Sequence, residues 1–576
     1  MSLLSSLYTG TSGLRVSQNA INTTAHNLAN VDTKGFTRQQ VILTDHTYST
    51  LGSNRVGVFQ VGTGTDISKV MTYRNMFYDQ SYRENNGRLG FYSAQYEAVN
   101  EVENLLGETE GVAFQNSVSS LWTNLQELSK DPGNIVVRSN FVNACVSFME
   151  RSQNIMDQLS EYQKSLNTNI VTQVDRINSI GSQITELNKK ICAAEAGDIE
   201  RANDYRDQRN VLLDELSEIV NISCSEDSSG AVSISIEGTQ FLSGARYYEM
   251  GITKVNEASS LLKPIWKHLG NQDVFNLDQE ISTELDTDIG YLKGLIIGRG
   301  NKEANYSDIP MKPERNDYAS DQDYDTAMAD YEDAVKKYNK TVDVSSIMTM
   351  QAQFDQLIHG IVTMMNDTLC PNTTVTDAVT GKTYTVLDTE KAPVGMDENG
   401  TQGVELFSRN NCSRYQEKVI NGKTYQVYQE EDPSDIHSLY SINQISVNQE
   451  ILSNYSMLAL SSNNGSGEFD LEVCQSLTEQ WQKPFATLSP NTLTTFDFNS
   501  YYTNMIGELA NRGNKFSTLA ESQQLTVDTI DGQRQSVSGV SSDEELTNLI
   551  RFQHAYSASS RYITTVNDLL ETLLNM

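Results

Sequence analysis

Acidic side chains at regular spacing are the first feature of this sequence that could support chemistry. Asp321, Asp323 and Asp325, with Glu332 at the twelfth position of the same stretch, have the spacing of the carboxylate ligands in a calcium-binding loop. The sharp turn of such a loop requires glycine, and Thr326 occupies that position. We therefore interpret the stretch as an acidic, solvent-exposed helix and predict no metal site there.

A glycine pair and the histidines are the other residues with binding or catalytic potential. Gly62 and Gly64 form a GxG sequence, but the third glycine of a dinucleotide-binding loop is absent, and strand-like residues 67–70 follow where that loop would open a helix. The motifs GxxxxGK(S/T), GxSxG and HExxH do not occur. None of the histidines joins a Ser, Cys or carboxylate arrangement; they are His26, His46, His268, His359, His437 and His554. The sequence therefore predicts a protein that is not an enzyme, with no catalytic residue, cofactor or metal.

The composition argues against several classes of partner. The chain has 576 residues, and 42 Lys and Arg against 75 Asp and Glu give a formal net charge of −33, which repels nucleic acid and anionic membrane surfaces. The six cysteines are spread too widely for metal-ligand spacing or a disulfide framework. No stretch approaches a membrane span, and residues 1–25 lack the basic and unbroken apolar regions of a cleaved secretory signal. We expect no nucleic-acid partner, no membrane insertion and no cleaved signal peptide.

Apolar residues at both ends of the chain recur at helical spacing. The N-terminal stripe consists of Leu3, Leu7, Leu14, Ile21 and Leu28, and the C-terminal stripe of Leu549, Phe552, Tyr556, Ile563, Val566, Leu570 and Leu573. Gly10 and Gly13 weaken the first helix, whereas Ser542-x-x-Glu545 predicts a capping box at the start of the second. Each stripe alone is typical of an ordinary amphipathic helix packed on its own domain.

Two narrow stripes at opposite ends of one chain favour pairing of the two terminal helices with each other. The residues between them would then form domains that project away from that helix pair. We predict that both ends are poorly ordered in the isolated monomer and pair as helices in a polymer, because a broken stripe is marginal alone. Between roughly residues 222 and 300 the apolar period changes from helical to two, as in Val232, Ile234 and Ile236, so we expect β structure there.

The pattern predicts a multidomain α+β protein with paired, coiled-coil-like terminal helices, a helical-bundle domain and β-rich outer regions inserted in the middle. The expected regions are terminal helices at 1–35 and 540–576, a mainly helical domain with a short β element at 36–220 and 480–539, and a β-rich outer region at 221–479 with a charged helical or loop insertion near 300–370.

A short motif follows the N-terminal stripe. It resembles the pattern ANxxTxGFxR shared by flagellar rod, hook and hook-associated proteins, and the residues of the motif region are Asn27, Ala29, Asn30, Thr33, Gly35, Phe36, Arg38 and Gln39. From the residues alone, Asn30 can end the helix and Gly35 can adopt the positive φ that redirects the chain.

The segments 205–217 and 538–559 narrow this resemblance to the hook-associated protein 1 family, the hook–filament junction proteins. The resemblance covers roughly residues 1–240 and 440–576. It implies a structural protein of the bacterial flagellum that is exported to the cell exterior without a cleaved signal peptide and assembles with copies of itself as a ring between hook and filament. It also implies contacts with the hook protein, with the next hook-associated protein on the filament side, and with a cytoplasmic export chaperone at the C-terminal helix.

Three alternatives compete with this interpretation. Another flagellar axial protein, a hook or rod subunit, would share the motif, although the length and the segment 538–559 argue against it. A secreted coiled-coil adhesin or effector would share the terminal helices but has no reason to carry the motif. An enzyme carried in residues 300–430 would need a nucleophile, metal or acid–base arrangement, and the sequence offers none that can be defended.

Overall fold

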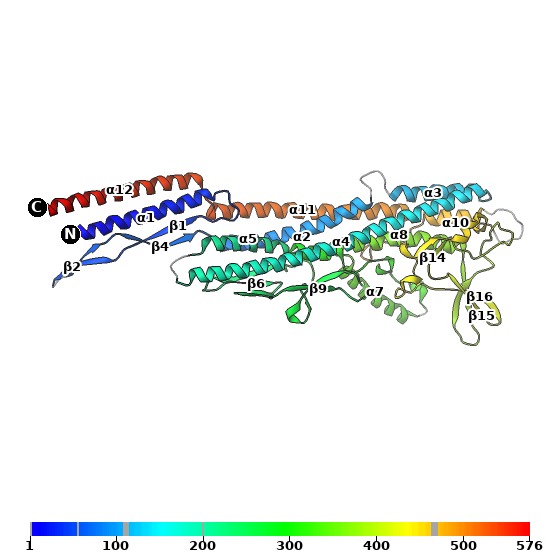
Figure 1. Cartoon of the computed structure of the whole chain (residues 1–576). Helices are drawn as coiled ribbons and strands as arrows, with labels where there is room; N and C mark the ends of the chain where they lie inside the picture. The colour runs from blue at the N-terminus through cyan, green and yellow to red at the C-terminus, as the bar shows by residue number, and fades with distance from the viewer. Residues whose placement is uncertain are drawn as a thin grey trace.

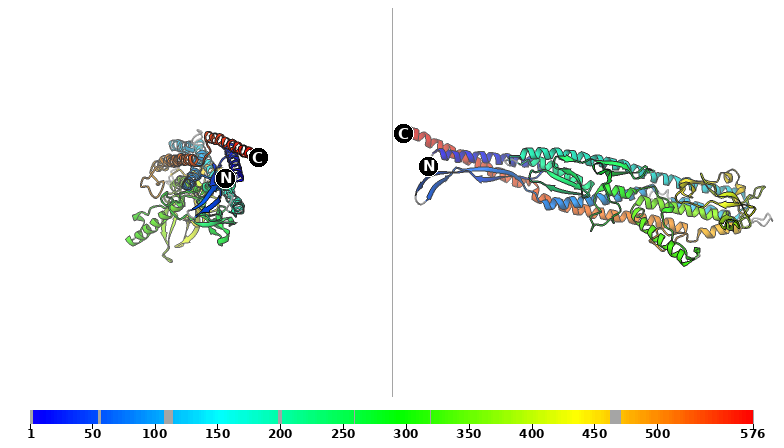
Figure 2. Two further views of the ribbon diagram at one scale, coloured as in Figure 1. Left: turned by 90° about the vertical axis from the view of Figure 1, so that its left-hand side faces the viewer. Right: turned by 90° about the horizontal axis from the view of Figure 1, so that it is seen from below.

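The computed structural model describes residues 3–54, 57–106, 114–197, 201–257, 259–318, 320–461 and 471–575. The molecule is elongated, and both termini lie at the same end (Figure 1). We call that end, residues 3–75 and 540–575, the terminal lobe, and the remainder the body. Viewed along its long axis the molecule is narrow, and viewed from below the lobe continues the direction of the body (Figure 2).

Long helices build the body. α4 (Ile135–Glu195) has 61 residues, and at about 1.5 Å per residue it spans about 90 Å. α2 (Met76–Leu106) and α11 (Phe498–Ser538) pack against each other along it (Figure 1). The shorter helices are α3 (Phe114–Lys130), α5 (Asn203–Ile219), α6 (Tyr291–Arg299), α7 (Asp321–Thr341), α8 (Ser346–Leu369), α9 (Gln449–Ser453) and α10 (Glu472–Trp481). Residues from most of them join one continuous apolar core, which holds the body together.

Small antiparallel sheets lie beside this bundle. The sheet β5–β8 contains Val232, Ile234 and Ile236 as a buried alternating row, which confirms the predicted change of period. The strands of the body are β5 (Ile222–Glu226), β6 (Val232–Ile236), β7 (Thr239–Ser243), β8 (Arg246–Tyr247), β9 (Met250–Lys254), β10 (Leu262–Trp266), β11 (Gln272–Asp273), β12 (Asn372–Thr376), β13 (Thr383–Leu387), β14 (Phe407–Arg409), β15 (Tyr415–Ile420), β16 (Lys423–Tyr428) and β17 (Ile445–Val447). The fold is thus a multidomain α+β arrangement with sheets inserted in the middle of the chain, as expected.

The charged stretch near residues 300–370 contains two very different helices. α7 carries the calcium-like aspartates on a largely exposed helix, and the Ser320 side chain caps it by accepting the Asp323 N–H at 3.1 Å. α8 is buried along most of its length and belongs to the core of the body. Among the described residues, no three His, Cys, Asp or Glu side chains form a group suited to a metal ion. Within the same residues, no helix is both long and apolar enough to cross a membrane.

The terminal lobe consists of two helices and two antiparallel two-stranded sheets. α1 (Leu3–Ala29) packs on α12 (Ser542–Leu574), and on its other side it contacts the strands β1 (Gln39–Asp45) and β4 (Thr65–Thr72). β2 (Tyr48–Asn54) and β3 (Gly57–Gly62) pair with each other and extend the hairpin away from the body (Figure 1). Gly62–Gly64 connect β3 to β4, which pair with β2 and β1 and not with each other, and Gly64 lies against Ser12 of α1.

The start of α12 corrects one prediction. The N-cap of this helix is Ser541, and no side chain caps it, so the predicted capping box from Ser542 to Glu545 does not form. The carboxylate of Glu545 is engaged elsewhere, because it accepts hydrogen bonds from Asn27 and Arg38. A tertiary contact therefore replaces the local one.

Candidate functional site

The two terminal helices run antiparallel and approach each other closely at two glycines. A Cβ atom at Gly10 would lie 2.5 Å from Ile563 Cγ1, and one at Gly13 would lie 2.7 Å from Ser559 Oγ. α12 thus occupies the space that larger side chains on α1 would need. Ala20, at helical spacing from both glycines, is also buried, as are Val16, Ser17, Thr24 and Asn27 of the same helix.

The apolar stripes lie beside this close contact. In the N-terminal stripe Leu7, Leu14, Ile21 and Leu28 are half-buried, and the side chain of Leu3 lies outside the described part of the structure. In the C-terminal stripe Val566 is buried, Leu549, Phe552, Ile563 and Leu570 are half-buried, and Tyr556 and Leu573 are exposed. Both stripes therefore keep apolar surface that the chain itself does not cover.

Asn27 is the centre of the motif. Its side chain is 1% exposed, and its amide group donates to the Gln39 carbonyl at 2.8 Å and to the Glu545 carboxylate at 3.0 Å. Its side-chain oxygen accepts the Gln39 N–H at 3.0 Å. One asparagine thus ties the end of α1 to the start of β1 and to α12, which is distant in sequence. A buried amide with its hydrogen-bonding groups satisfied in this way specifies a single arrangement.

Arg38 fastens the same corner from outside. Its side chain contacts Glu545 at 2.8 Å and Glu544 at 3.0 Å, and its backbone N–H donates to the Ser538 carbonyl at 2.8 Å. These carboxylates lie in the first turn of α12, where the helix dipole favours negative charge. The motif therefore binds both the last residue of α11 and the first turn of α12.

A second set of contacts joins the motif to the body. Asp207 on α5 accepts the Thr37 N–H at 2.9 Å and the Thr37 hydroxyl at 2.8 Å. Burial raises the pKa of Asp207 to about 6, although the Thr37 bonds and nearby Arg74 act in the opposite direction. Gly35 has φ +79°, as the sequence predicts, and a Cβ there would lie 2.2 Å from Val211 on α5. The loop can therefore lie this close to α5 only with glycine at position 35.

The remaining motif residues shape the loop. Asn30 follows the end of α1 and donates its side-chain amide to the His26 carbonyl at 2.9 Å, while Thr33 donates to the Asn30 side chain at 3.2 Å. Phe36 packs edge-on against His26, with ring centroids 5.4 Å apart. Ala29 is exposed and makes no comparable contact in the described structure. The loop also forms one wall of a pocket of about 610 Å³ against α4 and α5.

Ion pairs near these contacts join the lobe to the body and connect the helices of the body beside it. Arg74, just after β4, contacts Asp79 of α2 at 2.5 Å, and Arg534 of α11 contacts Asp214 of α5 at 2.6 Å. Arg534 also lies over the Tyr82 ring, 4.1 Å from its centroid. The lobe and body are thus connected mainly by directional polar contacts.

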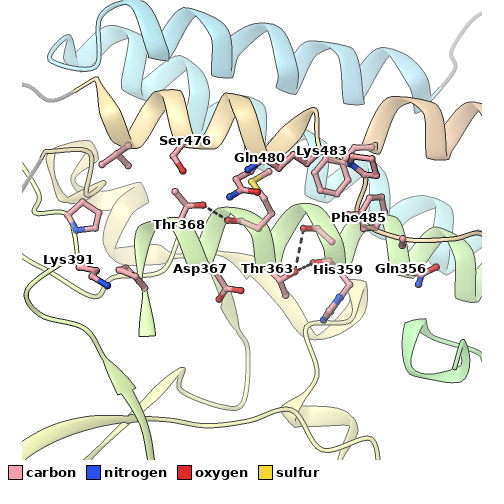
Figure 3. A pocket seen from close by; sticks show the side chains of 18 of the residues that line it. Gln356, His359, Thr363, Asp367, Thr368, Lys391, Ser476, Gln480, Lys483 and Phe485 are labelled. Atoms are coloured by element: carbon pink, nitrogen blue, oxygen red, sulfur yellow. Dashed lines mark hydrogen bonds between the residues drawn. The ribbon is translucent and has the colours of Figure 1, made fainter. Parts of the chain in front are cut away.

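A pocket of about 880 Å³ in the body provides the clearest place to look for chemistry (Figure 3). It lies between α8 and α10, and His359 faces it. The His359 ring stacks on Tyr306 at 3.7 Å and contacts Glu431 at 3.1 Å. Thr363, one turn further along α8, donates its hydroxyl to the His359 carbonyl at 2.7 Å rather than to the ring (Figure 3). The side chains around His359 act as a packing network, and we assign them no reaction.

Comparison with known proteins gives the same answer from both ends of the chain and from its middle. The family profile "Flagellar hook-associated protein FlgK helical domain" matches residues 99–382. "Flagella basal body rod protein" matches residues 7–37, and "Flagellar basal body rod FlgEFG protein C-terminal" matches residues 531–576. "Flagellar hook-associated protein 1" of Bacillus subtilis is 25% identical over 99% of this chain and 97% of its own length. The chain belongs to the flagellar hook-associated protein 1 family.

Other family members align over the same span. The Escherichia coli protein of that name is 24% identical over 98% of both chains, and the Salmonella typhimurium protein is 23% identical over 98% of both. A solved structure titled "The structure of the flagellar hook junction protein FlgK from Burkholderia pseudomallei" matches 80% of this chain and 100% of that chain, with 14% identity and a TM-score of 0.49.

Sequence reasoning missed three parts of this site. It treated Gly10 and Gly13 only as helix-weakening residues, and it gave no structural role to Asp207. It also assigned Glu545 to a cap. The signal that could have found Asp207 is its position in segment 205–217, which already carried the family resemblance. No local pattern marks a partner such as Glu545, 518 residues away from Asn27.

Proposed function

We propose that this chain is a structural, non-enzymatic subunit of the bacterial flagellum that joins hook to filament by self-assembly of its terminal lobe. The observation that carries the proposal is the motif centred on Asn27, which holds α1, β1 and α12 together in one arrangement. That arrangement leaves both apolar stripes partly uncovered, and exposed apolar surface favours association with other subunits.

The distribution of charge supports assembly through the lobe. Residues 1–75 and 540–576 contain eight Lys and Arg and eight Asp and Glu, so the entire formal charge of −33 belongs to residues 76–539. Neutral lobes can pack together without net repulsion, whereas bodies of like charge repel one another. This division favours a polymer with lobes at its centre and bodies directed outward.

The partners follow from that arrangement. A ring of such lobes presents one face to the hook protein and the other to the next hook-associated protein on the filament side. Export to the outside of the cell without a cleaved signal peptide completes this proposal. A hook or rod subunit would share the terminal segments, but the match of residues 99–382 to a hook-associated helical domain favours the junction role.

Deletion of the gene tests this function directly. The expected phenotype is hooks without filaments, with filament subunits lost to the medium, and restoration of filaments by the full-length chain. Electron microscopy of the cells and immunoblotting of the medium provide the readout. Normal filaments on the deletion strain would exclude the junction role.

We propose a cytoplasmic export chaperone that covers the C-terminal stripe before assembly. Half-buried Phe552 and exposed Tyr556 offer the largest apolar side chains of that stripe, so their truncation should weaken binding most. Co-purification from cells expressing either the full chain or a chain truncated after Gly539 is the test. Retention of the chaperone by the truncated chain would place its site elsewhere.

A further inference from the structure

A second exposed apolar surface lies at the joint between lobe and body. Met71, Tyr73, Met76 and Phe77 are 36%, 51%, 77% and 71% exposed, and they fall within seven consecutive residues. We call these four residues the joint patch. They belong to the end of β4, the following loop and the first turn of α2. Large apolar side chains gathered on a surface mark an interaction site, whereas scattered ones do not.

The joint patch is held on a rigid support. The Asn75 side chain accepts the Phe77 N–H at 3.0 Å, which fixes the start of α2. Arg74 donates two hydrogen bonds to the Asp79 carboxylate, at 2.5 and 3.0 Å, across the same turn. The polar side chains of this turn therefore bond to the chain itself, and the apolar ones point away from it. At a helix start that faces only water, the polar side chains would be exposed and the apolar ones would pack against the protein.

α11 packs beside the start of α2, the helix that carries part of the patch. Arg534 lies beside Asp79 at 3.7 Å, and Val537, about one turn beyond Arg534, is 41% exposed. Two arginines near the patch are paired within the chain, Arg74 with Asp79 and Arg534 with Asp214. The lobe from which the patch continues has no net formal charge, so the lobe of a second copy can approach it without net repulsion.

We propose that the joint patch is a contact with a second copy of this chain, so that the assembling surface extends from the terminal helices into the joint. The proposal rests on the proposed function, because it takes the lobe as the assembling region. The patch is continuous with that lobe, since β4 leads directly from it into α2 (Figure 1).

The size of the patch indicates when the contact forms. With about 200 Å² per large side chain, its four residues expose about 450 Å². A stable two-protein interface buries about 800 Å² on each partner. The joint patch alone is therefore too small to hold a dimer, and it acts only when the lobes of neighbouring copies are packed together as well.

Cross-linking in assembled flagella tests the identity of the partner. Met76 is replaced by the photoreactive amino acid p-benzoylphenylalanine, which couples to whatever side chain lies against it and does not involve the chain's own exposed Cys224. The variant is expressed from the chromosome, the cells are irradiated, and adducts of the chain are identified by mass spectrometry. We expect an adduct of two copies of this chain. The same replacement at Leu493 is the matched control, because Leu493 is 90% exposed but lies in the body, and it should give no such adduct. An adduct only with a different protein, or no adduct at all, would overturn the proposal.

The double variant Met76→Ser with Phe77→Ser tests the consequence. It removes apolar surface without changing a buried residue, so its circular dichroism should match that of the parent. We expect loss of filaments, with the variant chain recovered from the medium. The control pair Met311→Ser with Leu493→Ser, also highly exposed, should keep filaments. Full motility of the joint variant would refute the contact while leaving the junction role intact, and that role fails only if the deletion strain itself makes normal filaments.

Discussion

Asp355 gives a prediction whose sign and size can be worked from the structure. Its carboxylate is fully buried on α8 and accepts the backbone N–H groups of Ile442 at 2.8 Å and Tyr306 at 3.0 Å. Burial raises the pKa of Asp355 from 3.8 to about 6, although these two bonds, His359 and Ser441 lower it. A carboxyl with a raised pKa binds its proton more tightly in the folded chain than in the unfolded chain.

The folded state is therefore favoured at low pH, and this contribution is lost as the pH rises from about 4 through 6. With pKa values of 3.8 unfolded and about 6 folded, Asp355 should lower the free energy of unfolding by about 1.4 kcal/mol between pH 5 and pH 7.5. Asp355→Asn does not titrate. The variant should lose stability at both pH values, because Asn has only one acceptor oxygen, but it should lack this pH-dependent loss.

Urea unfolding of the full chain at the two pH values provides the assay. Tryptophan fluorescence reports the body alone, because Trp122, Trp266 and Trp481 all lie there. Other buried carboxyls in the body also titrate, so the decisive quantity is the difference in pH dependence between parent and variant. Asp330→Asn, exposed on α7, is the control and should behave as the parent. Equal pH dependence in the parent and in Asp355→Asn would refute a raised pKa at this position.

Three further predictions concern the terminal lobe. Gly10→Val should disrupt assembly, because the added Cβ would lie 2.5 Å from Ile563 and overpacking typically costs about 1–3 kcal/mol. Gly507→Val is the control and should keep assembly, because no atom lies within 4 Å of the added Cβ. Filament counts by microscopy compare the two variants. Ile563→Asp should abolish junction assembly but leave the circular dichroism of the body unchanged, because an unpaired carboxylate between α1 and α12 costs at least about 2 kcal/mol. Leu493→Asp is the exposed control. Full motility of Ile563→Asp would contradict a role for the contact between α1 and α12. Both chain ends should show little hydrogen-exchange protection in the dilute monomer, and strong protection of α1 and α12 there would disprove their dependence on the polymer.

The sequence predicts the elements of this molecule better than their contacts. The apolar spacing from Leu549 to Leu573 indicates a helix because each helical turn repeats the same local geometry, and α12 covers that whole span. The alternation of Val232, Ile234 and Ile236 is likewise local, and β6 contains all three. Such signals need only neighbouring residues, so a single sequence carries them.

Contacts between distant segments leave no such trace. Gly10 reduces the helix propensity of α1, and this is all that its immediate neighbours reveal. The absence of a side chain at Gly10 allows Ile563 of α12 to pack closely against α1, and only the fold brings these two residues together. Glu545 has the spacing of a capping residue, yet the charge-assisted bonds from Asn27 and Arg38 take its carboxylate away from the helix end. Where local and tertiary bonds compete for one group, sequence spacing alone cannot decide between them.

The contacts of Asn27 show how a short polar motif can fix the arrangement of the terminal helices. Apolar packing is non-directional, so stripes such as those of α1 and α12 permit sliding and rotation of one helix on the other. Asn27 removes that freedom, because its three hydrogen bonds are satisfied together in only one register of α1, β1 and α12. Thr37 and Asp207 then orient this unit on the body. In the proposed function, the apolar stripes provide the tendency to associate, and the motif fixes the geometry in which neighbouring subunits present those stripes.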